Sequence, residues 1–236
     1  MLDLHQLALG VTAEHPCSYL PQQSERLIFT LPDQLLSPDN YHQLMSANFR
    51  RTGEQLYRPY CQACQACQSV RIDVRTFHAN RSQRKLQKQA LARDWHWRVL
   101  PATAATDYFP LFAQYIRNKH AGSVMDPADP DSLAAMLHCQ WLDVQVLEQY
   151  LADQLVAVLI LDPLPDGLSA VYSFYQTDTG LALGKLAIIA AINWITQQQL
   201  RYLYLGFYIA DCQKMAYKAD FGPQQRLIGG YWQSFD

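Results

Sequence analysis

Four apolar stretches of strand length follow one another in the second half of this 236-residue chain. They cover residues 144–151, 155–161, 168–176 and 202–208 and are rich in β-branched and aromatic residues, as buried strands are. A single helical pattern, at residues 184–199, separates the last stretch from the other three. A succession of strands with few helices predicts an α+β fold, in which helices cover a sheet.

Turn signals set the limits of these elements. Residues 163–167 contain two prolines and a glycine, which predicts a hairpin between the second and third strands. Residues 126–131 contain two prolines and three aspartates and predict a loop. We expect one helix before this loop, from about residue 107, and another after it, ending near residue 141.

The first half of the chain has its own local signals. Ser37-Pro38-Asp39 predicts the start of a helix over residues 41–49, because Ser or Asp caps a helix and Pro suits its first turn. Apolar residues alternate with charged ones over residues 70–75, which predicts a half-buried strand.

Residues 82–93 favour a helix capped by Asn80. Residues 101–106 have the character of a linker. The sequence therefore predicts two domains, a smaller α+β part over residues 1–100 and a second domain over residues 105–236.

The net charge of −2 hides an uneven distribution of charge. Residues 50–98 carry eleven Lys and Arg and three acidic residues, a net charge of +8, whereas the remainder carries −10. Residues 81–93 alone contain five cations and no acid, and such a segment either contacts nucleic-acid phosphates or forms a solvated helix face. Trp95 and Trp97 follow it, but their alternation with polar residues favours packing in a strand over base stacking.

Three cysteines have the spacing Cys61-x-x-Cys64-x-x-Cys67. The N-terminus has no apolar signal-peptide core, which predicts a cytoplasmic protein in which disulfides are disfavoured. The cluster then indicates either reduced thiols or a structural site for zinc or an iron–sulfur cluster, with Cys17 as the fourth ligand.

Composition excludes two other classes of protein. Half of the residues are hydrophobic and 17% are charged, which is enough apolar surface to exclude a disordered chain. The most apolar helical pattern contains Lys185 and Asn193 and is too short to cross a bilayer, so we expect no membrane association.

Five blocks of residues carry a resemblance to a known family. They are residues 15–21 (HPCSYLP, with Glu25-Arg26 behind), 49–53 (FRRTG), 57–67 (YRPYC, ending in AC), 80–85 (NRSQRK) and 202–223 (YLYLGFYI, running into CQKMAYKADFGP). Together they resemble the N-end-rule aminoacyl-tRNA–protein transferases, and within them the bacterial aspartate/glutamate leucyltransferases, which are related to arginyl-tRNA–protein transferases. The likeness extends from about residue 12 to about residue 232.

The resemblance implies a reaction. An aminoacyl-tRNA would donate its amino acid, leucine by the likeness to the bacterial group, to the N-terminal amine of a protein that begins with Asp or Glu. The product would be marked for degradation by the N-end rule. Converting an aminoacyl ester into an amide is downhill, so no cofactor is required for catalysis. The enzyme must orient the amine, help to remove a proton and stabilise an oxyanion.

The resemblance also implies a fold, an N-acetyltransferase-like (GNAT) mixed sheet flanked by helices. True acetyltransferases hold coenzyme A with a Gly-rich turn at a helix N-terminus. The nearest segment here, residues 181–184 (LALG), lacks that pattern, which disfavours coenzyme A.

Candidate site residues follow from the family blocks. The acceptor carboxylate calls for a guanidinium fork, and the candidates for this role are Arg50, Arg51, Arg58 and Arg71. Arg81, Arg84 and Lys85 would bind tRNA phosphates, and Lys214 and Lys218, four residues apart, would bind the 3′ end of the tRNA from one helix face. Structural ion pairs and a solvated helix face are the alternatives for these two groups.

Catalytic candidates are fewer. Asp211 is the first candidate for the general base and His120 the second, and Tyr208 is a candidate donor to the oxyanion. Two other functions stay open at this point. One is a coenzyme A-dependent N-acetyltransferase, and the other is an RNA-binding or zinc-dependent interaction module without enzymatic activity.

Overall fold

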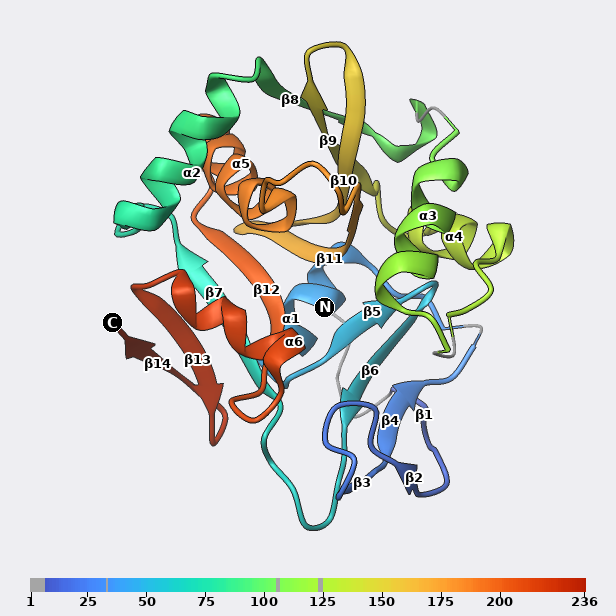
Figure 1. The fold of residues 1–236 in the computed structure, drawn as a ribbon. Coiled ribbons are helices and arrows are strands. Elements are labelled where there is room, and N and C mark those ends of the chain that lie inside the picture. The colour runs from blue at the N-terminus through green and yellow to red at the C-terminus, as the bar shows by residue number, and fades with distance from the viewer. Residues whose placement is uncertain (1–6, 33, 105–106, 123–124) are drawn as a thin grey trace.

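A computed structural model of the protein describes residues 7–32, 34–104, 107–122 and 125–236. Its main element is an eight-stranded sheet with the strand order β14-β13-β7-β12-β11-β10-β9-β8 (Figure 1). The bounds are β7 Gln68–Asp73, β8 Trp95–Pro101, β9 Gln145–Leu151, β10 Gln154–Leu164, β11 Gly167–Tyr175, β12 Tyr202–Tyr208, β13 Gln224–Ile228 and β14 Tyr231–Phe235. All neighbouring strands are antiparallel except β11 and β12, which are parallel, so the sheet is mixed.

Helices cover both faces of this sheet (Figure 1). On one face lie α5 (Leu183–Gln197), which connects β11 to β12, and α2 (Arg81–Leu91), which packs on α5 and β8. On the other face lie α1 (Pro38–Met45), α3 (Phe109–Lys119) and α4 (Pro130–Leu137). Each face has its own apolar core, which is why the strands between the two layers are hydrophobic on both sides.

A smaller sheet adjoins the large one. Its strands have the order β1-β4-β6-β5, with bounds Leu9–Val11, Leu27–Thr30, Gln55–Pro59 and Arg50–Thr52. Two short strands, β2 (His15–Pro16) and β3 (Ser24–Glu25), form a further ribbon. The 3₁₀ segment η2 (Ala102–Ala104) precedes α3, and α6 (Gln213–Ala216) and the 3₁₀ segment η3 (Tyr217–Asp220) follow β12.

The α+β fold with a mixed sheet between helices is confirmed, and so are most of the local signals. The Ser37 side chain accepts from the Asn40 backbone N–H at the start of α1, and Asn80 and Gln83 form a capping box at the start of α2. Trp95 and Trp97 pack in a strand as expected, because the Trp95 indole donates to Gln149 and Trp97 lies edge-on to Trp194.

Several element ends differ from those expected. The helix α1 ends at Met45, before residue 49, and α4 ends at Leu137, before residue 141. The large sheet contains strands from both predicted domains, because β7 and β8 pair with β12, β13 and β9, and the division into two domains stays a prediction. Residues 105–106 of the expected linker lie outside the described residues. No described helix is long and apolar enough to cross a membrane.

Candidate functional site

The parallel strands β11 and β12 separate soon after they meet. They pair only over Gly167–Ser169 and Tyr202–Tyr204, although β11 continues to Tyr175 and β12 to Tyr208. The contact is closest at Gly167, where an added Cβ would lie 1.9 Å from the Tyr202 carbonyl oxygen, so a side chain there would force the strands apart. Ligands in α/β proteins bind in the crevice beyond the carboxyl ends of parallel strands. We call the point at which the two strands diverge the β11–β12 notch.

Two buried cations lie against β12 where it leaves β11. Lys218, from η3, donates from Nζ to the carbonyl oxygen of Phe207. Arg50, from β5, donates to the Gly206 carbonyl at 3.4 Å, and its guanidinium lies 5.0 Å from the centroid of the Phe207 ring. Both residues are 6% exposed. The Gly206 and Phe207 carbonyls, beyond the residues that pair with β11, thus accept from these two cations.

No described carboxylate forms an ion pair with Arg50 or Lys218. The Arg50 Nε atom is buried and has no hydrogen-bond partner among the described residues. Burial and the positive charge of Arg50 lower the pKa of Lys218 to about 7, and burial also lowers the pKa of Arg50. The site therefore holds positive charge that the surrounding described residues do not neutralise.

Arg51, unlike its neighbour Arg50, is paired with a carboxylate. It points to the other side of β5, where Nε and Nη2 donate to the two carboxylate oxygens of Asp162 at 2.8 and 2.7 Å. Both side chains are fully buried. Its other donors contact the Gly53 and Met136 carbonyls, so the guanidinium is satisfied inside the protein. We therefore remove Arg51 from the acceptor-binding candidates and assign it to the core.

Arg71 is half-buried, and its guanidinium is held by neighbouring side chains. Its Nε donates to the Gln225 side chain at 2.7 Å, and the guanidinium lies 3.9 Å from the Tyr202 ring centroid and 4.2 Å from that of Trp232. These contacts join β7 to β12 and to the β13–β14 hairpin. Arg71 therefore acts as a cation–π anchor of the sheet instead of an acceptor ligand.

A cavity of about 860 Å³ lies between the small sheet, the end of β12 and the β13–β14 turn. Arg58, from β6, lines this cavity, and its guanidinium lies 5.4 Å from the Phe49 ring centroid and 6.0 Å from that of Tyr60. Phe207, which contacts both buried cations, lines it too. The cavity therefore connects Arg58 with the wall behind which Arg50 and Lys218 lie.

The four cysteines of the possible metal site line the same cavity as free thiols. They are Cys17, Cys61, Cys64 and Cys67. Burial and the neighbouring thiols of Cys17, Cys61 and Cys64 raise the pKa of Cys67 to about 12, which keeps its thiol protonated. Within the described residues, no three His, Cys, Asp or Glu side chains are arranged to hold a metal ion. The donors of the zinc or iron–sulfur alternative thus line one cavity but do not have the geometry of a ligand shell, and the alternative of reduced thiols stays open.

His120 lies at the C-terminal end of α3 and close enough to Lys214 to feel its charge. His120 follows the last residue of α3, its ring centroid is 5.4 Å from that of Tyr115, and Tyr115 in turn lies 4.8 Å from Tyr175 at the end of β11. Burial and the positive charge of Lys214 lower the pKa of His120, so its imidazole is neutral at pH 7. This histidine can accept a proton there.

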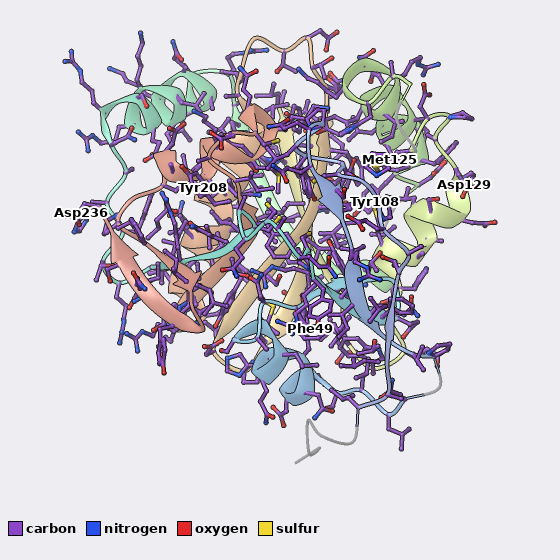
Figure 2. The ribbon with its side chains drawn as sticks, turned by 90° about the horizontal axis from the view of Figure 1, so that it is seen from below. Phe49, Tyr108, Met125, Asp129, Tyr208 and Asp236 are labelled. Carbon is purple, nitrogen blue, oxygen red and sulfur yellow. The ribbon has the colours of Figure 1, made fainter. Side chains whose placement is uncertain are left out.

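The other two catalytic candidates lie elsewhere. Asp211 is exposed in the turn after β12 and forms none of the ion pairs found among the described side chains. Tyr208 packs on the α2 and α5 face, with the Arg226 guanidinium 3.8 Å from its ring centroid. Figure 2 shows Tyr208 on the side nearer α2, whereas Phe49, which precedes Arg50, lies beside α1. Tyr208 therefore does not share the environment of Arg50.

The basic helix α2 is joined to the segment that carries Lys218. Asn80 Nδ2 and Gln83 Nε2, at the start of α2, both donate to the Asp220 carbonyl of η3, at 3.3 and 3.0 Å. Arg81, Arg84 and Lys85 are exposed on this helix, at the outer edge of the molecule in Figure 1. The structure thus brings the basic helix next to the α6–η3 segment at the end of β12.

Lys214 and Lys218 do not share a helix face as the sequence predicts. The helix α6 ends at Ala216, and the chain continues as the 3₁₀ segment η3, in which a turn takes about three residues. Lys214 is exposed as a result, whereas Lys218 turns into the protein. Of these two lysines, Lys214 alone remains available to a phosphate at the surface.

Gly206 is a site residue that the sequence reasoning missed. The pairing of β12 with β7 shifts in register between Tyr204 and Gly206, and Gly206 has a φ of +76°. This irregularity places the carbonyl that Arg50 contacts. A single glycine inside an apolar strand is a signal for such a bulge, and it was present at residues 202–208.

Comparisons with known proteins agree over the whole chain. The family model described as "Arginine-tRNA-protein transferase, N terminus" matches residues 15–85, and "Arginine-tRNA-protein transferase, C terminus" matches residues 107–228. The "Aspartate/glutamate leucyltransferase" of Vibrio cholerae serotype O1 is 37% identical over 231 residues, 98% of each chain. The protein of that name from Saccharophagus degradans is 36% identical over 237 residues and 100% of each chain.

A solved structure shares the fold. A conserved protein of unknown function from Bacteroides thetaiotaomicron matches 66% of this chain and 55% of its own, with a TM-score of 0.50 and 11% identity. At this identity the likeness concerns the fold alone.

Proposed function

The chain belongs to the arginine-tRNA-protein transferase family, and we propose that it transfers leucine from leucyl-tRNA to the N-terminal amine of proteins that begin with Asp or Glu. The family membership makes it an enzyme, an aminoacyl-tRNA–protein transferase, with an aminoacyl-tRNA as donor and a protein as acceptor. Leucine and the acidic first residue are the parts that we propose, by likeness to the relatives named aspartate/glutamate leucyltransferase. Because charged tRNA is present where translation takes place, the proposed reaction belongs to the cytoplasm.

The observation that carries this proposal is the junction between α2 and η3 at Asp220. It joins the helix with the exposed run of cations, which suits phosphates, to the η3 segment that carries Lys218. We place the aminoacyl ester at the end of β12, which this segment follows. The acceptor carboxylate has candidates at the same place, since Arg50 lies at the notch and Arg58 lines the adjoining cavity. Donor and acceptor would therefore meet at the carboxyl end of β12.

The transfer consists of one exchange of bonds. The acceptor's amine attacks the ester carbonyl, the new C–N bond forms, and the ester C–O bond breaks to release the 3′-terminal ribose hydroxyl of the tRNA. An α-ammonium group has a pKa near 8, so most acceptor amines must first lose a proton at neutral pH. That first proton is lost to solvent. The nitrogen loses a second proton as the C–N bond forms, and we assign this one to His120, which its depressed pKa keeps neutral and which passes the proton on to the leaving ribose oxygen.

A transfer assay tests the proposal. Purified protein is mixed with radiolabelled leucyl-tRNA and a protein that begins with Asp, and the label in the protein fraction is measured. We expect incorporation with Asp and Glu acceptors and none with an acetylated N-terminus. Failure with both leucyl-tRNA and arginyl-tRNA would reject the proposal. Consumption of acetyl-coenzyme A by the same protein would favour the N-acetyltransferase alternative.

The basic helix gives a second prediction. Replacing Arg81, Arg84 and Lys85 by Ala should lower the affinity for tRNA and reduce the slope of log K against log salt by about 2–3, because about one counterion is released per phosphate contact. Binding is measured by filter retention at several salt concentrations. Arg75→Ala is the control, since Arg75 is exposed but paired with Asp73. An unchanged slope in the triple variant would remove α2 from the tRNA site.

A further inference from the structure

We propose that Lys218, together with Arg50, receives the side-chain carboxylate of the acceptor's first residue and so determines the preference for acidic N-termini. This inference rests on the proposed function and deepens it, because the sequence pattern assigns Lys218 to the tRNA. The first observation is the burial of both side chains without a carboxylate partner among the described residues. The hydrogen-bond partners of Lys218 Nζ are the Phe207 carbonyl and the Met215 sulfur.

Arg51 shows how this chain treats a buried cation that serves the fold. It is the next residue after Arg50, and a fully buried carboxylate takes two of its hydrogen bonds. An unpaired buried charge is costly, so proteins pair such charges unless another partner arrives. Arg50 and Lys218 have no such partner within the described chain, and their charges also repel each other. A carboxylate from outside would supply the missing negative charge.

The cavity gives a carboxylate a way in. Phe207 contacts both cations and lines the cavity, and Cys67 and Tyr57 line it too. The cations therefore lie directly behind one wall of a cavity of about 860 Å³. This space is large enough for the first residues of an acceptor chain. Neither cation lines the cavity, so a carboxylate in it would reach them past Phe207. Their positive charge would attract the carboxylate there, whereas an amide of the same shape carries no charge.

The position of Lys218 explains how recognition is linked to chemistry. Its Nζ is hydrogen-bonded to the strand that borders the notch, so a carboxylate held there places the acceptor's α-amine, three bonds away in Asp, at the end of the notch. In Glu the α-amine lies one methylene farther from the side-chain carboxylate than in Asp. A flexible lysine accommodates this difference better than a rigid guanidinium alone.

The experiment compares acceptors that differ only in charge. The ratio of kcat/KM for an Asp-starting peptide to that for the matching Asn-starting peptide is measured in the wild type, Lys218→Met and Lys119→Met. Lys119 is an exposed lysine at the end of α3 and serves as the control. We expect the ratio to fall about 10–100-fold in Lys218→Met, as for loss of a hydrogen bond to a charged group, and by less than about twofold in Lys119→Met. The loss should fall on the Asp peptide, with the Asn peptide little changed.

Each outcome has a distinct meaning. A wild type that transfers to neither peptide contradicts the proposed function itself. A wild type that transfers and discriminates, with a Lys218→Met variant that discriminates equally, contradicts only the role of Lys218. An equal fall in kcat/KM with both peptides, together with a raised KM for tRNA, would show that Lys218 binds the tRNA instead of the acceptor. If Lys218→Met fails to fold, Lys218→Arg keeps the charge and is expected to retain a preference for Asp of at least about tenfold.

Discussion

Replacing Asp162 by Asn is expected to lower the free energy of unfolding by about 3–5 kcal/mol, because it leaves the buried guanidinium of Arg51 without its counter-charge. Both side chains are fully buried, and the pair joins β5 of the small sheet to β10 of the large one. The loss therefore affects the contact between the two sheets as well as a single hydrogen bond. Urea denaturation followed by circular dichroism measures the change.

Two matched variants make this test specific. Arg75→Ala breaks an ion pair in which the Arg75 side chain is 60% exposed, and it should cost less than about 1 kcal/mol. The double replacement of Arg51 by Met and Asp162 by Leu removes both charges and should recover most of the stability lost in Asp162→Asn. A cost below about 1 kcal/mol in Asp162→Asn would show that the pair does not hold the sheets together.

The elements that were predicted correctly are those determined by neighbouring residues. The start of α2 depends on Asn80 and Gln83, three residues apart, and the start of α1 depends on Ser37 and Asn40. Strand periodicity and the turn at residues 163–167 are also local, and the β10–β11 hairpin forms there. Such signals are complete within a few residues, so the sequence alone contains them.

The β13–β14 hairpin was missed although its signal is local. Gly229 and Gly230 separate two five-residue strands and have φ angles of +58° and +84°, which a two-residue hairpin turn requires. The strands themselves contain several polar residues, because β14 is at the edge of the sheet. Burial does not alternate strictly from residue to residue along either strand, so the two-residue period is weak.

The site could be predicted only in part because its decisive contacts are distant in sequence. Arg50 and Arg51 look equivalent in the sequence, and what distinguishes them is Asp162, 111 residues away from Arg51. The same holds for Lys218, whose burial depends on β12 and on Arg50 of the small sheet. The sequence provides the types of residue in the site, whereas the pairing of strands determines which cations keep a partner.

This difference in pairing connects stability to function. The chain neutralises Arg51 and leaves Arg50 and Lys218 without a carboxylate from the described residues, so part of its stability is given up at the place where a substrate carboxylate would bind. Such a cost is visible in the free protein without any substrate. This loss of stability depends on the protonation of Lys218. Measuring the free energy of unfolding at several pH values therefore reveals it.

The stability of the wild type should rise with pH between about 7 and 10.5 through Lys218. The pKa of this lysine is about 7 in the folded protein, lowered by burial and by Arg50, and 10.5 when the side chain is freely solvated, as in the unfolded chain. Between these values the unfolded chain binds more protons than the folded one, so raising the pH favours folding. Below pH 7 the lysine is charged in both states and the cost of burying its charge is complete, about 4–5 kcal/mol in total.

Comparing wild type with Lys218→Met isolates this contribution, because the other titrating groups cancel in the difference. The variant should gain about 4 kcal/mol relative to the wild type on going from about pH 10 to about pH 6, as measured by urea denaturation at each pH. The groups that face Lys218 are Arg50, Cys67 and Cys212, and a Cys212→Ala background removes the thiol nearest in sequence. A saturating Asp-starting peptide should reduce the pH dependence, since a bound carboxylate restores the charged lysine. A stability difference that does not change with pH would mean that Lys218 is not buried as a titrating amine, and the carboxylate site would lose its second cation.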